Sequence, residues 1–388
     1  MGVATEGRVE ALLATDEHAE VIAAFYRDAW GQEATAHAVV ESRRRAAAEN
    51  VAAPGQAPPT ALVLDAGRVI GYCGSIGQRL WDGVAEHPAY WVKGLMVLPA
   101  YRSGPIGFLV VKQLAALLPR AAALVVAPAA RRLFGAVGFA DLGAATNWVR
   151  PLRGGRLAQR IDVAGLGLGL PRWIVAGAEL TQRSGLATLA GAAVGVGLGL
   201  MAATTDRAAA RIATAQDREA PSRAELDALW LEARGALEAS PVRDGRYIRG
   251  RFDGEGDGNP YAFVTARHGG RLLGVAVVRR PRVSGDPRLR GVRLGTVSEL
   301  VFPPERADVG MTLLGAAARV ARTAGADALL CTTSHRAVAT LLRRQGYLRV
   351  PGNVHLLVHD RTATAPRWPS DVASWWLARG DSDADDVF

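Results

Sequence analysis

An internal repeat is the feature that most restricts how this 388-residue chain can fold. Three pairs of segments match in the same order along the chain: Gly67–Gly71 with Gly270–Gly274, Gly107 with Gly310, and Gly138–Phe139 with Gly346–Tyr347. The first two pairs are 203 residues apart and the third is 208 residues apart. Because chance matches would not keep one order and nearly one offset, the pattern predicts a duplicated domain.

Both copies predict the same series of elements. The first copy predicts helices over 16–30 and 35–49, a hairpin over 61–76, and strands over 91–98 and 122–127. The second predicts a helix over 222–239, which opens on a capping-box pattern at Ser222 and Glu225, a hairpin over 261–278, and strands over 295–302 and 327–333. In each copy an apolar helix separates the last two strands, and a short helix and a final strand follow. We therefore expect an α/β fold with a mixed sheet in each of two tandem domains.

The expected domains are residues 1–152 and 216–362, with a linker over 153–215 and a tail over 363–388. Hydrophobic residues make up 49% of the chain and charged residues 21%, which is typical of globular domains. Cys73 and Cys331 are the two cysteines and make no disulfide framework, which fits a reducing compartment. The first residues do not combine a basic segment with an apolar run, so we predict a cytoplasmic location.

The linker contains an unusual stretch, residues 184–205, that has no charged side chain. Small residues recur there every four positions, at Ala187, Gly191, Gly195, Gly199 and Ala203, and form a smooth stripe on a helix. Three interpretations stay open: a buried linker helix, a helix that associates with or spans a membrane, and a flexible linker. The stripe also offers a contact for a homo-oligomer.

Two motifs carry a resemblance to a known family. Val97, Pro99, Tyr101, Arg102, Ile106 and Gly107 match the pattern V-x-P-x-Y-R-x-x-x-I-G, and Ala130, Leu133, Phe134, Gly138 and Phe139 match A-x-x-L-F-x-x-x-G-F. In this order, around a helix and a strand, they resemble the cofactor motifs of the GCN5-related N-acetyltransferase (GNAT) family. The resemblance covers residues 8–152 well and 216–360 more weakly, so the chain resembles a tandem GNAT protein. In that family, loop amides hold the pyrophosphate of acetyl-CoA, and the pantetheine lies between two splayed strands.

The resemblance implies a cofactor site in the first copy, made by Leu95, Val97, Arg102, Ser103, Gly104, Ile106 and Gly107. Pro105 stands where the family pattern has its central glycine, and proline has no N–H to offer a phosphate. The amides of Gly104, Ile106 and Gly107 remain, with Arg102 nearby. In the second copy the loop is one residue shorter, and Asp308 brings a carboxylate to the place of the pyrophosphate. We therefore expect acetyl-CoA to bind in the first copy only.

The catalytic residues are less clearly marked. Glu299 lies on the strand before the second loop, where a GNAT often has its general base, whereas the first copy has Lys93 in that neighbourhood. A salt bridge or a solvated strand end are the alternatives for Glu299. The tyrosine that serves as general acid in the family would fall at Phe134 and Leu342, and neither side chain has a hydroxyl. Tyr101 is a weaker catalytic candidate.

Two other patterns argue for no metal. His355 and His359 face one side of a strand but have no third ligand at a suitable spacing, so we expect a structural pair. The acidic residues 381–385 lack the glycine and the distal glutamate of a calcium loop, and we expect a solvated tail there.

These features predict an acyl-CoA-dependent N-acyltransferase, with acetyl-CoA as the expected donor and an amine of a small molecule or glycan as the acceptor. One alternative is an aminoacyl-tRNA-dependent transferase of tandem GNAT type, because the net charge of +9 permits tRNA binding. We expect no DNA partner, since this charge comes almost entirely from arginine and fits a compositional bias. A second alternative is a degenerate GNAT pair that binds or scaffolds without catalysis.

Overall fold

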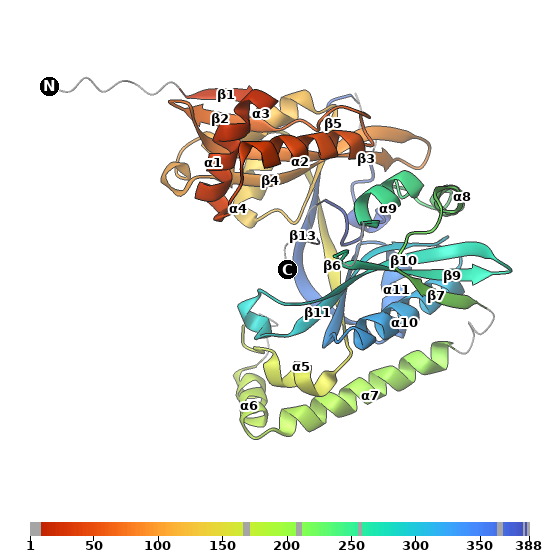
Figure 1. Ribbon diagram of the computed structural model, residues 1–388. Coiled ribbons are helices and arrows are strands. Elements are labelled where there is room, and N and C mark those ends of the chain that lie inside the picture. Colours follow the sequence, from red (N-terminus) through yellow and green to blue (C-terminus); the bar gives the residue numbers. More distant parts are fainter. Residues whose placement is uncertain are drawn as a thin grey trace. The chain divides into compact units, whose positions relative to one another are not determined.

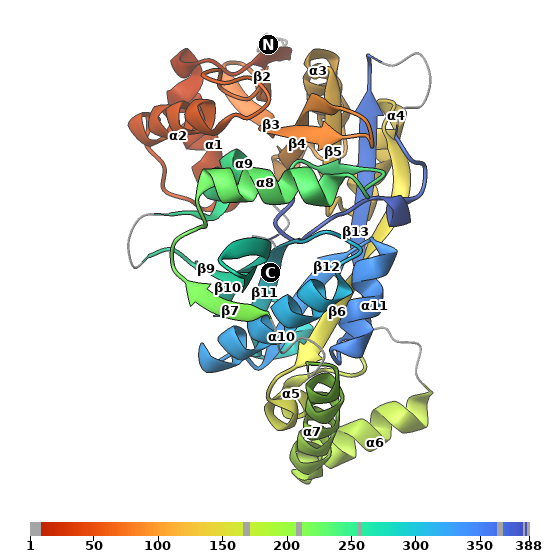
Figure 2. The same ribbon diagram turned by 90° about the vertical axis from the view of Figure 1, so that its right-hand side faces the viewer.

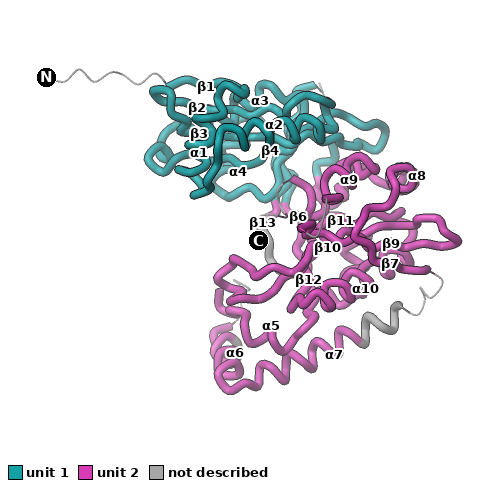
Figure 3. The backbone as a smooth tube through the Cα atoms, viewed as in Figure 1, with its two compact units in different colours: residues 1–143, 355–370 teal, residues 144–354, 371–388 magenta. Residues whose placement is uncertain are grey.

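The computed structural model describes residues 9–165, 171–206, 212–254, 258–362, 368–382 and 385. The chain forms two compact units, and each is discontinuous in sequence (Figure 3). Unit 1 consists of residues 1–143 and 355–370, and unit 2 of residues 144–354 and 371–388. The expected domains, 1–152 and 216–362, are by contrast contiguous.

Unit 1 contains a mixed sheet in the order β1-β2-β3-β4-β5-β13 (Figure 1). Its strands are β1 (Glu10–Leu13), β2 (Ala61–Asp65), β3 (Arg68–Trp81), β4 (Glu86–Val97), β5 (Arg120–Leu124) and the last part of β13 (Leu348–Asp360). Its helices are α1 (Ala19–Trp30), α2 (Ala36–Glu49), α3 (Ile106–Leu117) and α4 (Pro128–Ala136), with short 3-10 turns η1 (Asp16–His18) and η2 (Pro99–Tyr101). Strands β4 and β5 are parallel and the other neighbours antiparallel.

Unit 2 contains a sheet with the same plan, in the order β7-β9-β10-β11-β12-β6. Its strands are β6 (Ala140–Pro151), β7 (Ala213–Asp217), β9 (Tyr261–His268), β10 (Arg271–Val283), β11 (Arg293–Val301) and β12 (Ala328–Thr333), and β8 (Ser240–Pro241) is a short addition. Its helices are α5 (Gly154–Arg160), α6 (Arg172–Arg183), α7 (Leu186–Asp206), α8 (Arg223–Arg234), α9 (Gly245–Phe252), α10 (Ala307–Thr323) and α11 (Arg336–Arg344), with 3-10 turns η4 (Pro287–Leu289) and η5 (Val372–Ser374). Here β11 and β12 are the parallel pair.

The two sheets agree in strand order and direction, as a duplication predicts. The first strand of each also follows the offset of the repeat, because β1 begins at Glu10 and β7 at Ala213, 203 residues later. The last strand of each copy pairs in the other unit: β13 pairs with β5 through Leu356–Asp360, and β6 pairs with β12 through Thr146–Pro151. This exchange of strands makes both units discontinuous.

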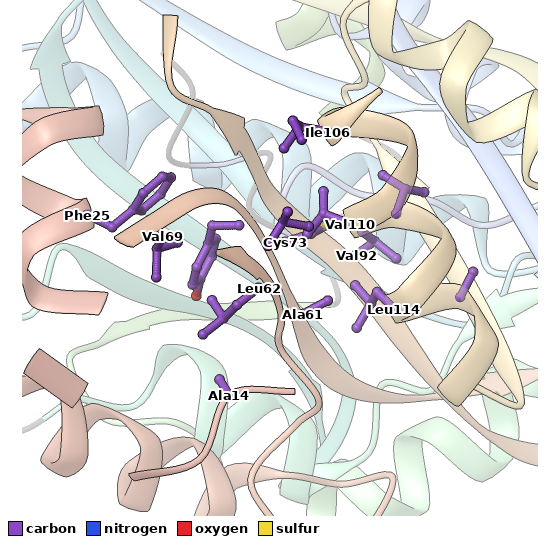
Figure 4. Packing of buried hydrophobic residues seen from close by; sticks show 14 of the residues in the cluster. Ala14, Phe25, Ala61, Leu62, Val69, Cys73, Val92, Ile106, Val110 and Leu114 are labelled. Carbon is purple, nitrogen blue, oxygen red and sulfur yellow. The ribbon is translucent and has the colours of Figure 1, made fainter. Parts of the chain in front are cut away.

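Local signals explain most of the element boundaries. The Ser222 hydroxyl accepts from the amide of Glu225, and the Glu225 carboxylate accepts from the Ser222 amide in return, so α8 begins as expected. This helix ends at Arg234, before Gly235, rather than at 239. The core of unit 1 lies between α1, α3 and the sheet, where Phe25, Val69 and Val110 are almost fully buried (Figure 4).

The linker stretch 184–205 is mostly the helix α7, which packs on α5 along the predicted small-residue stripe. A Cβ added to Gly191 would lie 2.4 Å from the carbonyl oxygen of Gly154, and one added to Gly154 would lie 2.0 Å from that of Gly191. Only glycine permits this approach. A Cβ on Gly199 would meet nothing within 4 Å, so the close contact ends before it, and the side chain of Ala203 lies outside the described residues. In the described part of the chain, we find no helix that has both the length and the apolar character to span a bilayer.

Candidate functional site

Strands β4 and β5 of unit 1 pair over three residues and then separate. Tyr90–Val92 of β4 lie beside Ala121–Ala123 of β5, and from Lys93 onward β4 has β3 as its strand partner. The register with β3 shifts between Lys93 and Met96, where Gly94 has a φ of +62°, so the strand carries a bulge there. On the other side, Val125 follows β5 with a φ of +58°, which is strained for a β-branched residue. Both strands therefore bend at the point where they part.

The predicted cofactor loop follows β4 and leads into α3. Pro105 is the N-cap of this helix, with φ −78° and ψ 0°, so the amides of Ile106 and Gly107 lie in its first turn and have no acceptor within the helix. The Gly104 amide donates to the carbonyl of Tyr101 at 3.2 Å, which engages one of the three expected donors. Arg102, Ser103 and Gly104 are exposed. The loop therefore offers two amides and an exposed surface at a helix N-terminus.

Arg102 is fixed by the strand that precedes it. Its Nε donates to the carbonyl oxygen of Val97 at 2.9 Å, and one terminal nitrogen lies 3.6 Å from the sulfur of Met96. Leu95 and Val97 are half-buried on the same strand. Gly107 has a packing role as well, because a Cβ there would lie 3.0 Å from the Cδ1 atom of Leu133.

Tyr101 makes a contact that the sequence did not indicate. Its hydroxyl donates to the carboxylate of Asp65 at 2.9 Å, which ties η2 to the end of β2. This hydrogen bond raises the pKa of the Tyr101 phenol, so the proton stays on the tyrosine. The contact gives Tyr101 a role in positioning the loop, and its catalytic role stays a prediction.

An aromatic cluster from α1 and β3 lies next to the bulge of β4. The rings of Phe25, Tyr26 and Trp30 pack on Tyr72 with centroid distances of 5.6 to 5.8 Å. The hydroxyls of Tyr26 and Tyr72 are 3.1 Å apart, and a Cβ on Gly94 would lie 3.6 Å from the Tyr72 ring. Burial, with the neighbouring Tyr26, raises the pKa of Tyr72 well above its usual value. The Tyr72 phenol therefore keeps its proton at neutral pH.

Both histidines of β13 make polar contacts within unit 1. His355 contacts the Asp141 carboxylate at 2.9 Å and the Arg131 guanidinium at 2.8 Å, and His359 Nδ1 lies 3.1 Å from the carbonyl of Gly138. Among the described residues, no three His, Cys, Asp or Glu side chains are grouped as a metal site requires.

In unit 2 the corresponding strands also part, but the C-terminal segment fills the opening. Strands β11 and β12 pair from Leu294 to Val297, and beyond this point the backbone amide of Gly380 donates to Ser298 and the Trp376 indole donates to Leu300. These hydrogen bonds measure 2.6 Å and 3.0 Å. The space left between the strands and the segment is about 10 Å³, enough for about one water molecule. A Cβ on Gly380 would lie 2.8 Å from the Ser298 carbonyl, so this approach needs glycine.

Glu299 lies under this segment and is inaccessible to solvent. One of its oxygens accepts from Arg243 Nε at 2.7 Å, and another nitrogen of Arg243 donates to Asp381 at 2.9 Å. All three side chains are 0–1% exposed. Burial, together with the nearby charge of Asp381, raises the pKa of Glu299 to about 7, and Arg243 only partly offsets this rise because it serves both carboxylates. Of the alternatives, the salt bridge is the one observed, and it leaves the predicted base with no path to a substrate within unit 2.

The expectation of a solvated acidic tail is wrong for the described residues. Asp381 is 0% exposed and Asp385 is 3% exposed, because arginine and serine side chains of unit 2 surround them. Asp383 lies outside the described residues. Two tryptophans shortly before these aspartates are the sequence signal that this segment is buried. Trp375 is 0% exposed and Trp376 is 3% exposed.

The start of α10 also differs from that of α3. The two carboxylate oxygens of Asp308 accept from the Arg306 guanidinium at 3.0 Å and 2.8 Å. This pairing lowers the pKa of Asp308, which stays ionised in the first turn of the helix. The helix dipole is thus already complemented by a carboxylate.

Comparisons with known proteins test the resemblance. No protein-family model and no curated protein sequence matches the chain. Among solved structures, a GCN5-related N-acetyltransferase from Anabaena variabilis matches with a TM-score of 0.56 and 11% identity, over 91% of this chain and 73% of that one. The chain has the GNAT acyltransferase fold.

Two further structures agree with this result. A probable N-acyltransferase from Enterococcus faecalis matches with a TM-score of 0.54 and 9% identity, over 90% of this chain and 72% of that one. The N-myristoyltransferase of Saccharomyces cerevisiae with bound myristoyl-CoA matches with a TM-score of 0.52 and 12% identity, over 92% and 78%. At these identities the likeness concerns the fold, and the predicted α/β GNAT class is confirmed.

Proposed function

We propose that the chain is an acyl-CoA-dependent N-acyltransferase whose cofactor binds in unit 1. The observation that carries the proposal is the contrast between the two pairs of parting strands. In unit 2 the opening between β11 and β12 is filled by the chain itself, down to about 10 Å³. In unit 1, β4 has no strand partner on the β5 side beyond Val92 in the part of the chain that is described.

The loop of unit 1 fits a pyrophosphate better than that of unit 2. The amides of Ile106 and Gly107 and the exposed Arg102 supply donors and positive charge at a helix N-terminus. The corresponding helix of unit 2 begins with the ionised Asp308, which pairs with Arg306 and already complements the helix dipole where an anion would bind. Acetyl-CoA is the proposed donor. The aromatic rings beside Gly94 pack on one another, and this packing favours a short acyl group over a long one.

The proposed reaction is direct transfer of the acyl group to an amine of a small-molecule or glycan-type acceptor. The amine nitrogen attacks the thioester carbonyl carbon, a C–N bond forms, and the oxygen takes up negative charge that backbone amides at the β4 bulge stabilise. The nitrogen, positively charged after the attack, releases one proton to solvent water. The C–S bond then breaks, its electron pair stays on sulfur, and the thiolate takes a proton. The Tyr26–Tyr72 pair is the proposed source of that proton. Glu299 is left out of this mechanism because it is buried and paired.

Titration of the full chain with acetyl-CoA by calorimetry tests the proposal. We expect one site per chain, no binding in Gly104→Glu, and unchanged binding in Gly250→Glu. The two variants are matched, since a Cβ on Gly104 meets only the Tyr101 carbonyl at 3.6 Å and one on Gly250 meets nothing within 4 Å. Two sites in the wild type, with one left in Gly104→Glu, would place a cofactor in unit 2. A flat wild-type titration would refute the enzyme and favour a non-catalytic pair.

A further inference from the structure

The helices α6 and α7 expose apolar side chains that none of the described residues of unit 2 covers. On α6, Trp173 is 76% exposed and Leu180 is 68% exposed, and their spacing of seven residues puts them on one face. On α7, Leu186, Leu189 and Val196 are 55–69% exposed and also share a face. Both views of the ribbon place these helices at one end of unit 2, beyond α5 (Figures 1 and 2).

The exposure of α7 has no explanation in its packing. The opposite side of this helix, at Ala187 and Gly191, already contacts α5. A helix with one face on a protein and the other in water ordinarily carries charges on the outer face, yet residues 184–205 contain none. The helix is therefore apolar on both sides, and one of those sides is open.

The charge of the neighbouring residues indicates which kind of surface covers the open side of α7. Residues 151–183, which include α5 and α6, contain five arginines and two carboxylates, a net charge of +3. Arg172 and Arg183, at the two ends of α6, are exposed, and no described carboxylate forms a salt bridge with either. Exposed tryptophan, leucine and valine with arginines at the border are the composition of helices that lie in a membrane interface.

A groove adds to the apolar surface between the same helices. It has a volume of about 340 Å³ and is lined by side chains of α5, α6 and α7, among them Leu157, Ala158, Ala190 and Val194. By helical periodicity the groove lies on the side of α7 that faces α5, away from Leu189 and Val196, so it is a second apolar surface separate from the exposed face.

We propose that α6 and α7 dock unit 2 on the surface of a bilayer that contains anionic phospholipids. Helix α7 lies along the surface, because its inner side is held by α5 and its outer side contacts the acyl chains. Arg172 and Arg183 contact phosphate groups at the border. This inference does not depend on the proposed acyltransferase activity.

Co-sedimentation of the full chain with vesicles tests the proposal. We expect binding to phosphatidylcholine vesicles that contain phosphatidylglycerol, and binding at least about tenfold weaker to phosphatidylcholine alone or at high salt. The double variant Leu189→Glu/Val196→Glu is expected to lose at least about tenfold in affinity.

The matched control is Leu231→Glu/Val283→Glu. These residues are 57% and 62% exposed, close to the 69% and 62% of Leu189 and Val196, and lie on α8 and β10. We expect this control to bind vesicles like the wild type. Equal loss in both double variants, or no binding of the wild type to the anionic vesicles, would overturn the proposal. A wild-type dimer that Leu189→Glu/Val196→Glu dissociates, without vesicle binding, would assign the surface to a second copy of the chain.

Discussion

Replacement of Glu299 by glutamine should remove a specific pH dependence from the stability of unit 2. In the folded protein the pKa of this carboxyl is about 7, against an ordinary value of 4.5, because the side chain is buried and shares Arg243 with Asp381. The folded chain therefore holds a proton that the unfolded chain releases. The contribution of this group to the free energy of unfolding is therefore largest below about pH 4.5 and is lost as the pH rises to about 7.

The size of the effect follows from the two pKa values. A rise from 4.5 to about 7 corresponds to about 3 kcal/mol of stability lost between low and neutral pH, at 1.36 kcal/mol for each pKa unit. Glutamine keeps an oxygen that can accept from Arg243 Nε and from the Leu300 amide but does not titrate. The difference in unfolding free energy between the variant and the wild type should thus grow by about 3 kcal/mol over this range.

Urea unfolding of both proteins at several pH values between 4.5 and 8 measures this difference. Carboxylates remote from Glu299 cancel in the comparison, since both proteins contain them. Asp381 shares Arg243 with Glu299 and adds to the difference in the same direction, because its raised pKa falls when the neighbouring charge is removed. Glu305→Gln is the matched control. It is the same chemical change shortly after the end of the same strand, but the Glu305 side chain is exposed. If the difference between wild type and Glu299→Gln stays constant with pH, or if Glu305→Gln reproduces it, the reasoning about the buried carboxylate pair is wrong.

Four further predictions concern the two pairs of parting strands. Arg102→Ala should weaken acetyl-CoA binding by about 1–3 kcal/mol in calorimetry, more so at low salt, and leave the melting temperature nearly unchanged. Pro105→Gly should change that affinity only modestly, because it adds an amide donor and also frees the unliganded loop. Gly94→Ala should cost about 1–2 kcal/mol in urea unfolding, since the φ of +62° favours glycine, and should lower the transfer rate. Trp376→Ala should cost about 3–5 kcal/mol by removing a side chain that is 3% exposed, while acetyl-CoA affinity stays at the wild-type value.

The parts of the fold that the sequence predicted depend on local signals. The capping box at Ser222, the hairpin turns and the proline–glycine loop before α3 act over a few residues, and each element lies where its signal indicated. Strands β1 and β7 gave no such signal. Each has only four or five residues of mixed polarity, and their partners, β2 and β9, lie far along the chain.

The partner of a last strand could not be predicted for a similar reason. Nothing in the sequences of β6 and β13 distinguishes the two possible partners, and the exchange depends on which edge each strand reaches in the folded chain. Tertiary contacts also decide the aromatic cluster, since the Tyr26–Tyr72 contact joins residues 46 apart. The burial of the C-terminal segment also depends on tertiary contacts. Its alternating aspartates predict exposure to solvent, because the sequence does not show that distant arginines pair with them.

The separation of strands β11 and β12 explains why the C-terminal segment packs in the second copy. Two strands that separate leave carbonyl groups, such as those of Ser298 and Leu300, without a ladder partner, and unpaired buried groups cost about 1–3 kcal/mol each. In unit 2 Gly380 and the Trp376 indole satisfy these two carbonyls, and tryptophan and leucine side chains fill the space between the strands. A bound cofactor would satisfy the same needs only while it is present. In the second copy Asp308 and its partner Arg306 already occupy the helix start, and the C-terminal segment fills the opening permanently. In the function proposed above, the first copy, with Arg102 and the amides of Ile106 and Gly107 at the same place, leaves that role to a ligand.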